Sequence, residues 1–195
     1  MDLLTRVFRE MSPLEVLAAL LVLVNVWLIT RRSIWNYAFG LAGVTIYGWV
    51  FFGHKLYSDS LLQLFFFVVQ IYGWREWLRS QANEGEVRVE RLTGPQRLAW
   101  LAGIVAAVAG WGWLMHRFTD ASFPWWDAAV AMTSVAAQIL MSVRRIENWW
   151  LWIAANVLSI GLYAAKALWI TTGLYLILLA ISISGLVAWR KAARA

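Results

Sequence analysis

The sequence predicts an all-α integral membrane protein with seven transmembrane helices, and three observations support this fold class. The 195 residues are 62% hydrophobic and 14% charged, with a mean hydropathy of +0.62, whereas soluble domains carry about 25% charged residues. The chain has room for seven mostly apolar segments of the roughly 20 residues that a bilayer crossing requires. Finally, the second half of the chain repeats the first without a gap. Together these features exclude an ordinary soluble domain.

The seven helices are expected where long apolar runs are separated by short polar ones. Pro13 and Pro124 mark two helix starts, since the first helical position does not need its N–H group. The longest polar stretch, Ser80–Gln96, is expected to be an exposed loop. The predicted spans are 14–30, 34–53, 58–79, 96–116, 124–143, 147–165 and 170–190.

The internal repeat keeps one constant register along the chain. Identical residues lie at matching positions in both halves: Arg32 and Arg144, Ile34 and Ile146, Asn36 and Asn148, Gly73 and Gly185, Trp77 and Trp189. The first three helices therefore match the last three, and the fourth lies between them. Because three crossings are an odd number, the fourth helix gives both copies the same direction. This is a parallel 3+1+3 plan, as in the sugar-transporting SWEET proteins, and duplicated helix sets of this kind are typical of secondary transporters.

We therefore expect three parts in the chain: a first repeat over residues 1–79, a loop and linker helix over 80–116, and a second repeat over 117–195. The positive charges also predict an orientation. The spaces after the first, third, fifth and seventh helices hold twelve Lys and Arg residues, and the opposite side holds five. The positive-inside rule then places the C-terminus in the cytoplasm. Loop charges of this kind also account for the net charge of +6 without a nucleic-acid partner.

Polar side chains form stripes on several predicted helices at helical spacing. Polar groups in hydrocarbon are costly unless satisfied, so these stripes should face the protein interior. Amides can donate and accept hydrogen bonds, and indole faces attract cations and flat rings. The stripes comprise Gln63, Phe67, Gln70 and Trp74 on the third helix, Gln138 on the fifth, and Asn148, Trp152, Asn156, Ser159 and Tyr163 on the sixth.

Each stripe also has a purely structural interpretation. An amide in a membrane helix often only bonds a neighbouring helix, and for a single residue such as Gln70 the two interpretations are equally weighted. Matched stripes on both copies of a repeat favour a binding site. Trp residues near helix ends are typical of interfacial anchors, and these are Trp77, Trp125, Trp126, Trp150, Trp169 and Trp189. The small residues Ala102, Ala106 and Gly110 predict a close helix contact, either between subunits or internal.

Several kinds of chemistry are not indicated. The chain has no cysteine, and neither histidine has a second histidine or a carboxylate at metal-ligand spacing. It lacks a nucleotide-binding phosphate loop, an intramembrane carboxylate for proton relay, and a nucleophile with an adjacent base. We therefore expect neither an enzyme nor a resident cofactor or metal. Passive transport of a small molecule is the simplest expectation.

Two segments resemble a known family. LYSDSLLQLFF at 56–66, followed by YGWREW at 72–77, is similar to the third core helix of the Pnu vitamin transporters. IENWWLWIAANVLS at 146–159 resembles their N-W-x-x-W-I-x-x-N signature. The resemblance covers nearly the whole chain, and the best-known type in this family is the nicotinamide riboside transporter.

The resemblance implies a SWEET-like homotrimer in the bacterial inner membrane. Such proteins take up a dephosphorylated vitamin by facilitated diffusion, and a cytoplasmic kinase traps it by phosphorylation without binding the carrier stably. Nicotinamide riboside is the first expectation, with thiamine, riboflavin or a nucleoside as alternatives. The substrate contacts implied by the family motifs are Gln63, Asn148, Trp149, Trp152 and Asn156; the helical-face argument adds Trp35, Gln70, Gln138 and Tyr163.

Overall fold

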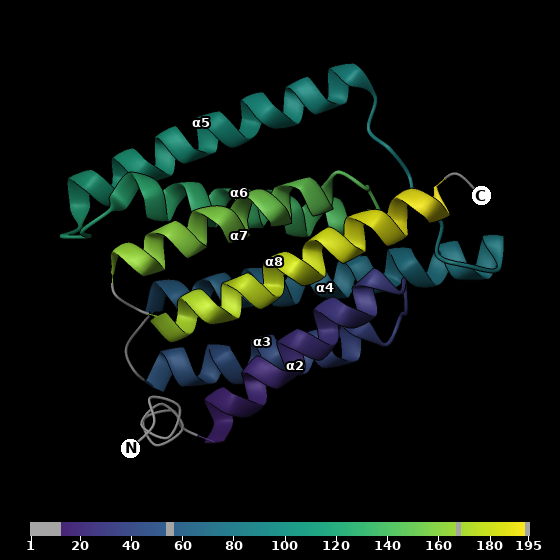
Figure 1. The fold of residues 1–195 in the computed structure, drawn as a ribbon, viewed down its shortest axis with the longest axis horizontal. Helices are drawn as coiled ribbons and strands as arrows, with labels where there is room; N and C mark the ends of the chain where they lie inside the picture. Colours follow the sequence, from purple (N-terminus) through teal and green to yellow (C-terminus); the bar gives the residue numbers. More distant parts are fainter. Residues whose placement is uncertain (1–12, 54–56, 167–168, 194–195) are drawn as a thin grey trace. The chain divides into compact units, whose positions relative to one another are not determined.

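The computed structural model describes residues 13–53, 57–166 and 169–193, and within these residues the chain forms seven α-helices and no strand. The prediction of seven helices is confirmed, with most boundaries within two residues of the expected ones (Figure 1). The helices are α2 (Pro13–Thr30), α3 (Asn36–Gly53), α4 (Tyr57–Glu84), α5 (Gly94–Phe118), α6 (Pro124–Ser142), α7 (Asn148–Ala165) and α8 (Trp169–Ala192).

The helices belong to two compact units, residues 1–87 and 88–195. In the first unit α3 packs against both α2 and α4. In the second unit α7 packs in the same way against α6 and α8, and α5 lies along α6 (Figure 1). The middle helix of each triple is thus the second in chain order, as the internal repeat requires.

The turns before α3 and α7 have the same backbone conformation. Arg32 and Arg144, which are repeat equivalents, have φ angles of 57° and 59°, and they are the two non-glycine residues with positive φ in the described chain. Each follows a helix that closes with a Schellman motif, in which Ser33 N donates to Leu28 O at 3.0 Å and Arg145 N donates to Leu140 O at 2.8 Å. The repeat seen in the sequence is therefore present in the backbone of the turns.

A left-handed conformation costs an L-residue about 1–2 kcal/mol, so glycine would be the ordinary choice at these turns. Both arginines instead bind acidic side chains from the segment between α4 and α5. Arg32 pairs with Glu86 at 2.9 Å, and Arg144 pairs with Glu90 at 3.3 Å. Glu90 also pairs with Arg145 at 2.7 Å. These ion pairs offset part of the backbone cost and fix both turns.

The expectation of an exposed loop over Ser80–Gln96 is wrong at both ends of the stretch and at its buried valines, although most of its residues are exposed. Helix α4 continues to Glu84, and α5 begins at Gly94 behind a capping box formed by Thr93 and Gln96. Between the helices, Val87 and Val89 are buried because their alternation with polar residues gives an extended segment one apolar face. Glu90 forms a parallel backbone bridge with Arg145, which holds this segment against the turn before α7.

The interfacial role expected for Trp77 and Trp189 is also wrong, because both side chains are fully buried. Each packs edge-on against a ring from the middle helix of its own triple. Trp77 meets Tyr37 at 5.3 Å between centroids, and Trp189 meets Trp149 at 5.6 Å. The two pairs occupy equivalent repeat positions. They form the aromatic core of each triple.

Three of the remaining terminal tryptophans, Trp125, Trp150 and Trp169, are 48%, 50% and 63% exposed, as interfacial anchors require. The small residues Ala102, Ala106 and Gly110 lie on the exposed side of α5. They therefore do not serve internal packing within this unit.

By length and hydropathy alone, two of the described helices, Gly94–Phe118 and Thr171–Ala192, are long and apolar enough to cross a bilayer, and Val16–Thr30 is a shorter apolar helix. The middle helices α3 and α7 are not singled out in this way, because their asparagine, glycine, tyrosine and tryptophan residues lower the mean hydropathy of each helix. The same polar and aromatic residues form the stripes from which the candidate site is built.

Candidate functional site

In the first unit, the predicted site residue Gln70 is buried and lies near the half-buried amide of Asn25. Its side chain is 5% exposed, and its Oε1 atom has no hydrogen-bond partner. It approaches α3 at Gly40, where a Cβ atom would lie only 2.0 Å from Gln70 Oε1. The same Cβ would lie 2.6 Å from Nδ2 of Asn25 on α2. Gly40 therefore lets two amide groups from two helices converge on the middle helix.

The other two first-unit candidates occupy different environments. Gln63 precedes Gln70 on the same face of α4 and is half-buried, with its Cβ against Gly48 of α3. Trp35 lies in the turn before α3 and is 72% exposed. Within its own unit, the structure does not bring Trp35 to the amide group around Gly40.

In the second unit, Asn156 connects α7 to α8. It is buried, and its Nδ2 atom donates to Ser182 Oγ at 3.0 Å. A further buried polar atom on this unit, Nε2 of Gln138 on α6, has no hydrogen-bond partner. A buried unsatisfied polar atom costs about 1–3 kcal/mol. Such atoms are retained most readily where a ligand can satisfy them.

Two aromatic candidates on α7 accompany these polar groups. Trp152 is half-buried, so part of its ring remains available to a ligand. Tyr163 stacks on Tyr175 of α8, with centroids 5.2 Å apart and planes inclined by 25°. Tyr175 also lies beside Ser159. Flat rings beside amides are suited to a substrate with an aromatic base and hydroxyl groups.

Asn148 and Trp149 occupy structural positions in this unit. Asn148 Nδ2 donates to Arg145 O at 2.5 Å, just as Asn36 Nδ2 donates to Ser33 O at 2.7 Å in the repeat-related turn. Trp149 is 1% exposed and fills the notch at Gly185. Each still carries a buried polar atom without a partner, Asn148 Oδ1 and Trp149 Nε1.

Sequence reasoning missed three polar residues that lie with the candidates, namely Asn25, Tyr175 and Ser182. The repeat could have identified two of them, because Tyr175 and Ser182 are the repeat equivalents of Gln63 and Gln70. The signal for Asn25 is simpler: it is the one amide in the apolar run 14–29.

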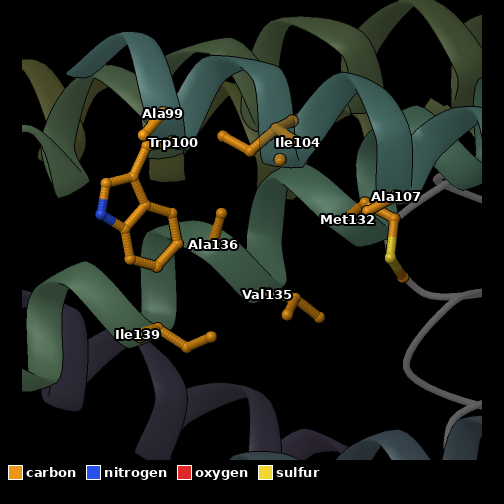
Figure 2. Close-up of a pocket in the computed structure, with 9 residues that line it drawn as sticks. Ala99, Trp100, Ile104, Ala107, Met132, Val135, Ala136 and Ile139 are labelled. Atoms are coloured by element: carbon orange, nitrogen blue, oxygen red, sulfur yellow. The ribbon is translucent and has the colours of Figure 1, made fainter. Parts of the chain in front are cut away.

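A cavity of about 390 Å³ lies elsewhere, between α5 and α6 of the second unit (Figure 2). Its walls are apolar or small side chains, among them Trp100, Met132 and Val135. A polar vitamin would lose its hydrogen bonds to water there without replacement. We therefore place the candidate site at the amide and aromatic groups. Among the described residues, no cluster of His, Cys, Asp or Glu could hold a metal ion.

The site combines buried amides and partly exposed rings, and it is built on a duplicated set of three helices. These features are typical of a membrane carrier for a small polar molecule with a flat ring. Comparison with known proteins agrees. A family model described as "Nicotinamide mononucleotide transporter" matches residues 12–191. The chain belongs to this family of transporters, and it is accordingly a multi-pass membrane protein.

Particular relatives refine the comparison. The chain is 32% identical to a nicotinamide riboside transporter PnuC of Escherichia coli, over 95% of this chain and 88% of that protein. A riboflavin/roseoflavin transporter, RibM of Streptomyces davaonensis, is 26% identical over 90% of this chain and 83% of its own length. Among solved structures, a vitamin B3 transporter PnuC aligns with a TM-score of 0.78 and 29% identity, covering 98% of this chain and 86% of that one.

Proposed function

We propose that this protein carries nicotinamide riboside across the bacterial inner membrane by facilitated diffusion. A cytoplasmic kinase then phosphorylates the vitamin, and the phosphorylated product is too charged to return through the carrier. The observation that supports this most is a pair of buried amide atoms without hydrogen-bond partners, Gln70 Oε1 and Gln138 Nε2, in a family of vitamin transporters. The ribose hydroxyls and the carboxamide of nicotinamide riboside offer the hydrogen bonds that these amides lack.

Within this proposal, the substrate contacts are the predicted residues, with different roles. Trp152 and Tyr163 supply ring faces for the pyridinium, because aromatic faces attract cations. Gln63, Gln70, Gln138 and Asn156 supply hydrogen bonds. Asn148, Trp149 and Trp35 complete the set; the first two contribute through their unpartnered polar atoms. Access alternates between the two sides of the membrane, as in other transporters built from duplicated helix sets.

We also propose the wider setting of the carrier. The repeats run parallel in a SWEET-like 3+1+3 arrangement, and the C-terminus lies in the cytoplasm because positive charges concentrate on that side. The protein assembles as a homotrimer with one pathway in each subunit. The exposed stripe of Ala102, Ala106 and Gly110 on α5 is suited to close helix contact between subunits.

Riboflavin and thiamine are the alternative substrates of the same carrier mechanism. The relation to RibM favours the first, since that protein is named for riboflavin transport. Thiamine, like nicotinamide riboside, has a cationic ring and a hydroxyl group. The higher identity to PnuC is the reason for preferring the riboside.

Counterflow in proteoliposomes tests the proposal. Vesicles loaded with unlabelled nicotinamide riboside should accumulate labelled riboside transiently, without a proton or sodium gradient. Thiamine-loaded and riboflavin-loaded vesicles provide the matched comparisons. Accumulation that requires an ion gradient would contradict facilitated diffusion. Accumulation only in riboflavin-loaded vesicles would identify riboflavin, in place of nicotinamide riboside, as the substrate.

A further inference from the structure

The convergence of two amides on Gly40 has a geometry that a single buried amide would not provide. Gln70 Oε1 and Asn25 Nδ2 lie 2.0 and 2.6 Å from one point, the Cβ position of Gly40. The two atoms are therefore at most the sum of these distances, 4.6 Å, apart. They nevertheless do not bond each other, because Gln70 Oε1 has no hydrogen-bond partner.

One donor and one acceptor thus lie side by side. Asn25 Nδ2 uses one hydrogen on the carbonyl of Asn36, at 2.7 Å, and has a second to offer. Gln70 Oε1 accepts nothing and is buried. A planar carboxamide carries the complementary pair, a carbonyl oxygen that accepts and an N–H that donates.

The second repeat does not provide this arrangement. The repeat equivalents of Asn25, Gly40 and Gln70 are Ala137, Trp152 and Ser182. At the position of Gly40, where the first copy brings two amide groups together, the second copy carries an indole. This difference assigns separate tasks to the two repeats: hydrogen-bond recognition in the first and ring stacking in the second.

We propose that Asn25 and Gln70, spaced by Gly40, form a carboxamide-recognition site that sets the specificity of the carrier. Asn25 donates to the carboxamide oxygen, and Gln70 Oε1 accepts from its N–H group. A carboxylate in the same place would set its oxygen against Gln70 Oε1, so the acid analogue is rejected. This inference rests on the proposed function, because it presumes a substrate with a pyridinium carboxamide.

The test compares ligands that differ only in this group: nicotinamide riboside, 1-ribosylpyridinium, which lacks the carboxamide, and nicotinic acid riboside. In calorimetric titration of the full-length protein in detergent, nicotinamide riboside should bind at least about tenfold more tightly than 1-ribosylpyridinium or nicotinic acid riboside. The reason is that one hydrogen bond contributes about a factor of ten to the affinity. In Asn25→Leu and Gln70→Met, affinity for nicotinamide riboside should fall about tenfold, while affinity for 1-ribosylpyridinium stays unchanged.

Two further variants separate recognition from packing. Gly40→Ala drives a methyl group into the amide pair and should abolish the preference for the carboxamide. Gly43→Ala is the matched control, because it places a methyl on the same helix 3.3 Å from Val22 and away from the amides; it should keep the preference. Unchanged 1-ribosylpyridinium binding shows that a variant remains folded.

An equal loss of affinity for nicotinamide riboside and 1-ribosylpyridinium in Asn25→Leu and Gln70→Met would overturn the assignment, because the two amides would then serve only helix packing. Unchanged preference in Asn25→Leu and Gln70→Met would overturn it as well. Failure of the wild-type protein to bind nicotinamide riboside, with binding of another vitamin, would overturn both the proposed function and this inference. The wild-type titration alone separates that result from the first two.

Discussion

Gly185→Ala should destabilise the second unit through Trp149. A Cβ atom at Gly185 would lie 2.4, 2.5 and 2.7 Å from three atoms of the Trp149 indole. That ring is 1% exposed and packs edge-on against Trp189, so it has no free space into which to move. Overpacking of this kind costs about 1–3 kcal/mol, of which alanine's better helix propensity recovers less than about 1 kcal/mol. We expect a net loss of about 1–2 kcal/mol.

Thermal unfolding of the purified protein, followed by intrinsic tryptophan fluorescence, measures this loss. Gly173→Ala on the same helix is the control, because a Cβ there meets nothing within 4 Å; it should be neutral or stabilising. Trp149→Phe removes the clashing part of the indole and should recover stability in the Gly185→Ala background relative to that substitution alone. If Gly185→Ala unfolds no earlier than Gly173→Ala, the tight packing inferred for the aromatic core is refuted.

Three further predictions follow from other contacts. Trp152→Ala should weaken substrate binding by roughly 1–3 kcal/mol, the usual value of ring stacking, with little change in unfolding temperature; normal transport by this variant would remove Trp152 from the site. Gly112→Ala should cost less than about 1 kcal/mol, although its Cβ would lie 2.4 Å from Trp125, because that ring is 48% exposed and can swing away. Glu90→Gln removes the ion pairs to Arg144 and Arg145 and should lower stability by about 0.2–1 kcal/mol, an effect that shrinks as salt is raised. Asp120→Asn is the charge-matched control, and an equal shift in both variants would argue against the ion pairs.

The seven helices could be predicted well because long apolar runs and the internal repeat are both visible along the chain without knowledge of its contacts. The prediction failed at the segment after α4. There the signal was the short alternation of Val87 and Val89 with charged residues, which is easily read as loop when the surrounding stretch is polar. It also failed at Trp77 and Trp189. Position near a helix end favours an anchor, and only the pairing with Tyr37 and Trp149 reveals a core.

Helical periodicity identified the polar faces of the candidate site but could not indicate how each amide is used. Asn148 and Asn156 look alike in the sequence, yet one amide bonds the backbone of its own turn and the other bridges two helices. The convergence of Asn25 and Gln70 was also beyond prediction, because it depends on the packing of three helices at Gly40. Contacts between helices that are distant in the sequence need coordinates.

The central claim, that this family member carries nicotinamide riboside, is tested most directly by calorimetric titration of the detergent-purified wild-type protein. Nicotinamide riboside, thiamine and riboflavin are titrated in parallel. We expect micromolar binding of nicotinamide riboside and none of the other two. Binding of thiamine or riboflavin in place of the riboside would contradict the claim while leaving the fold and the carrier class unchanged.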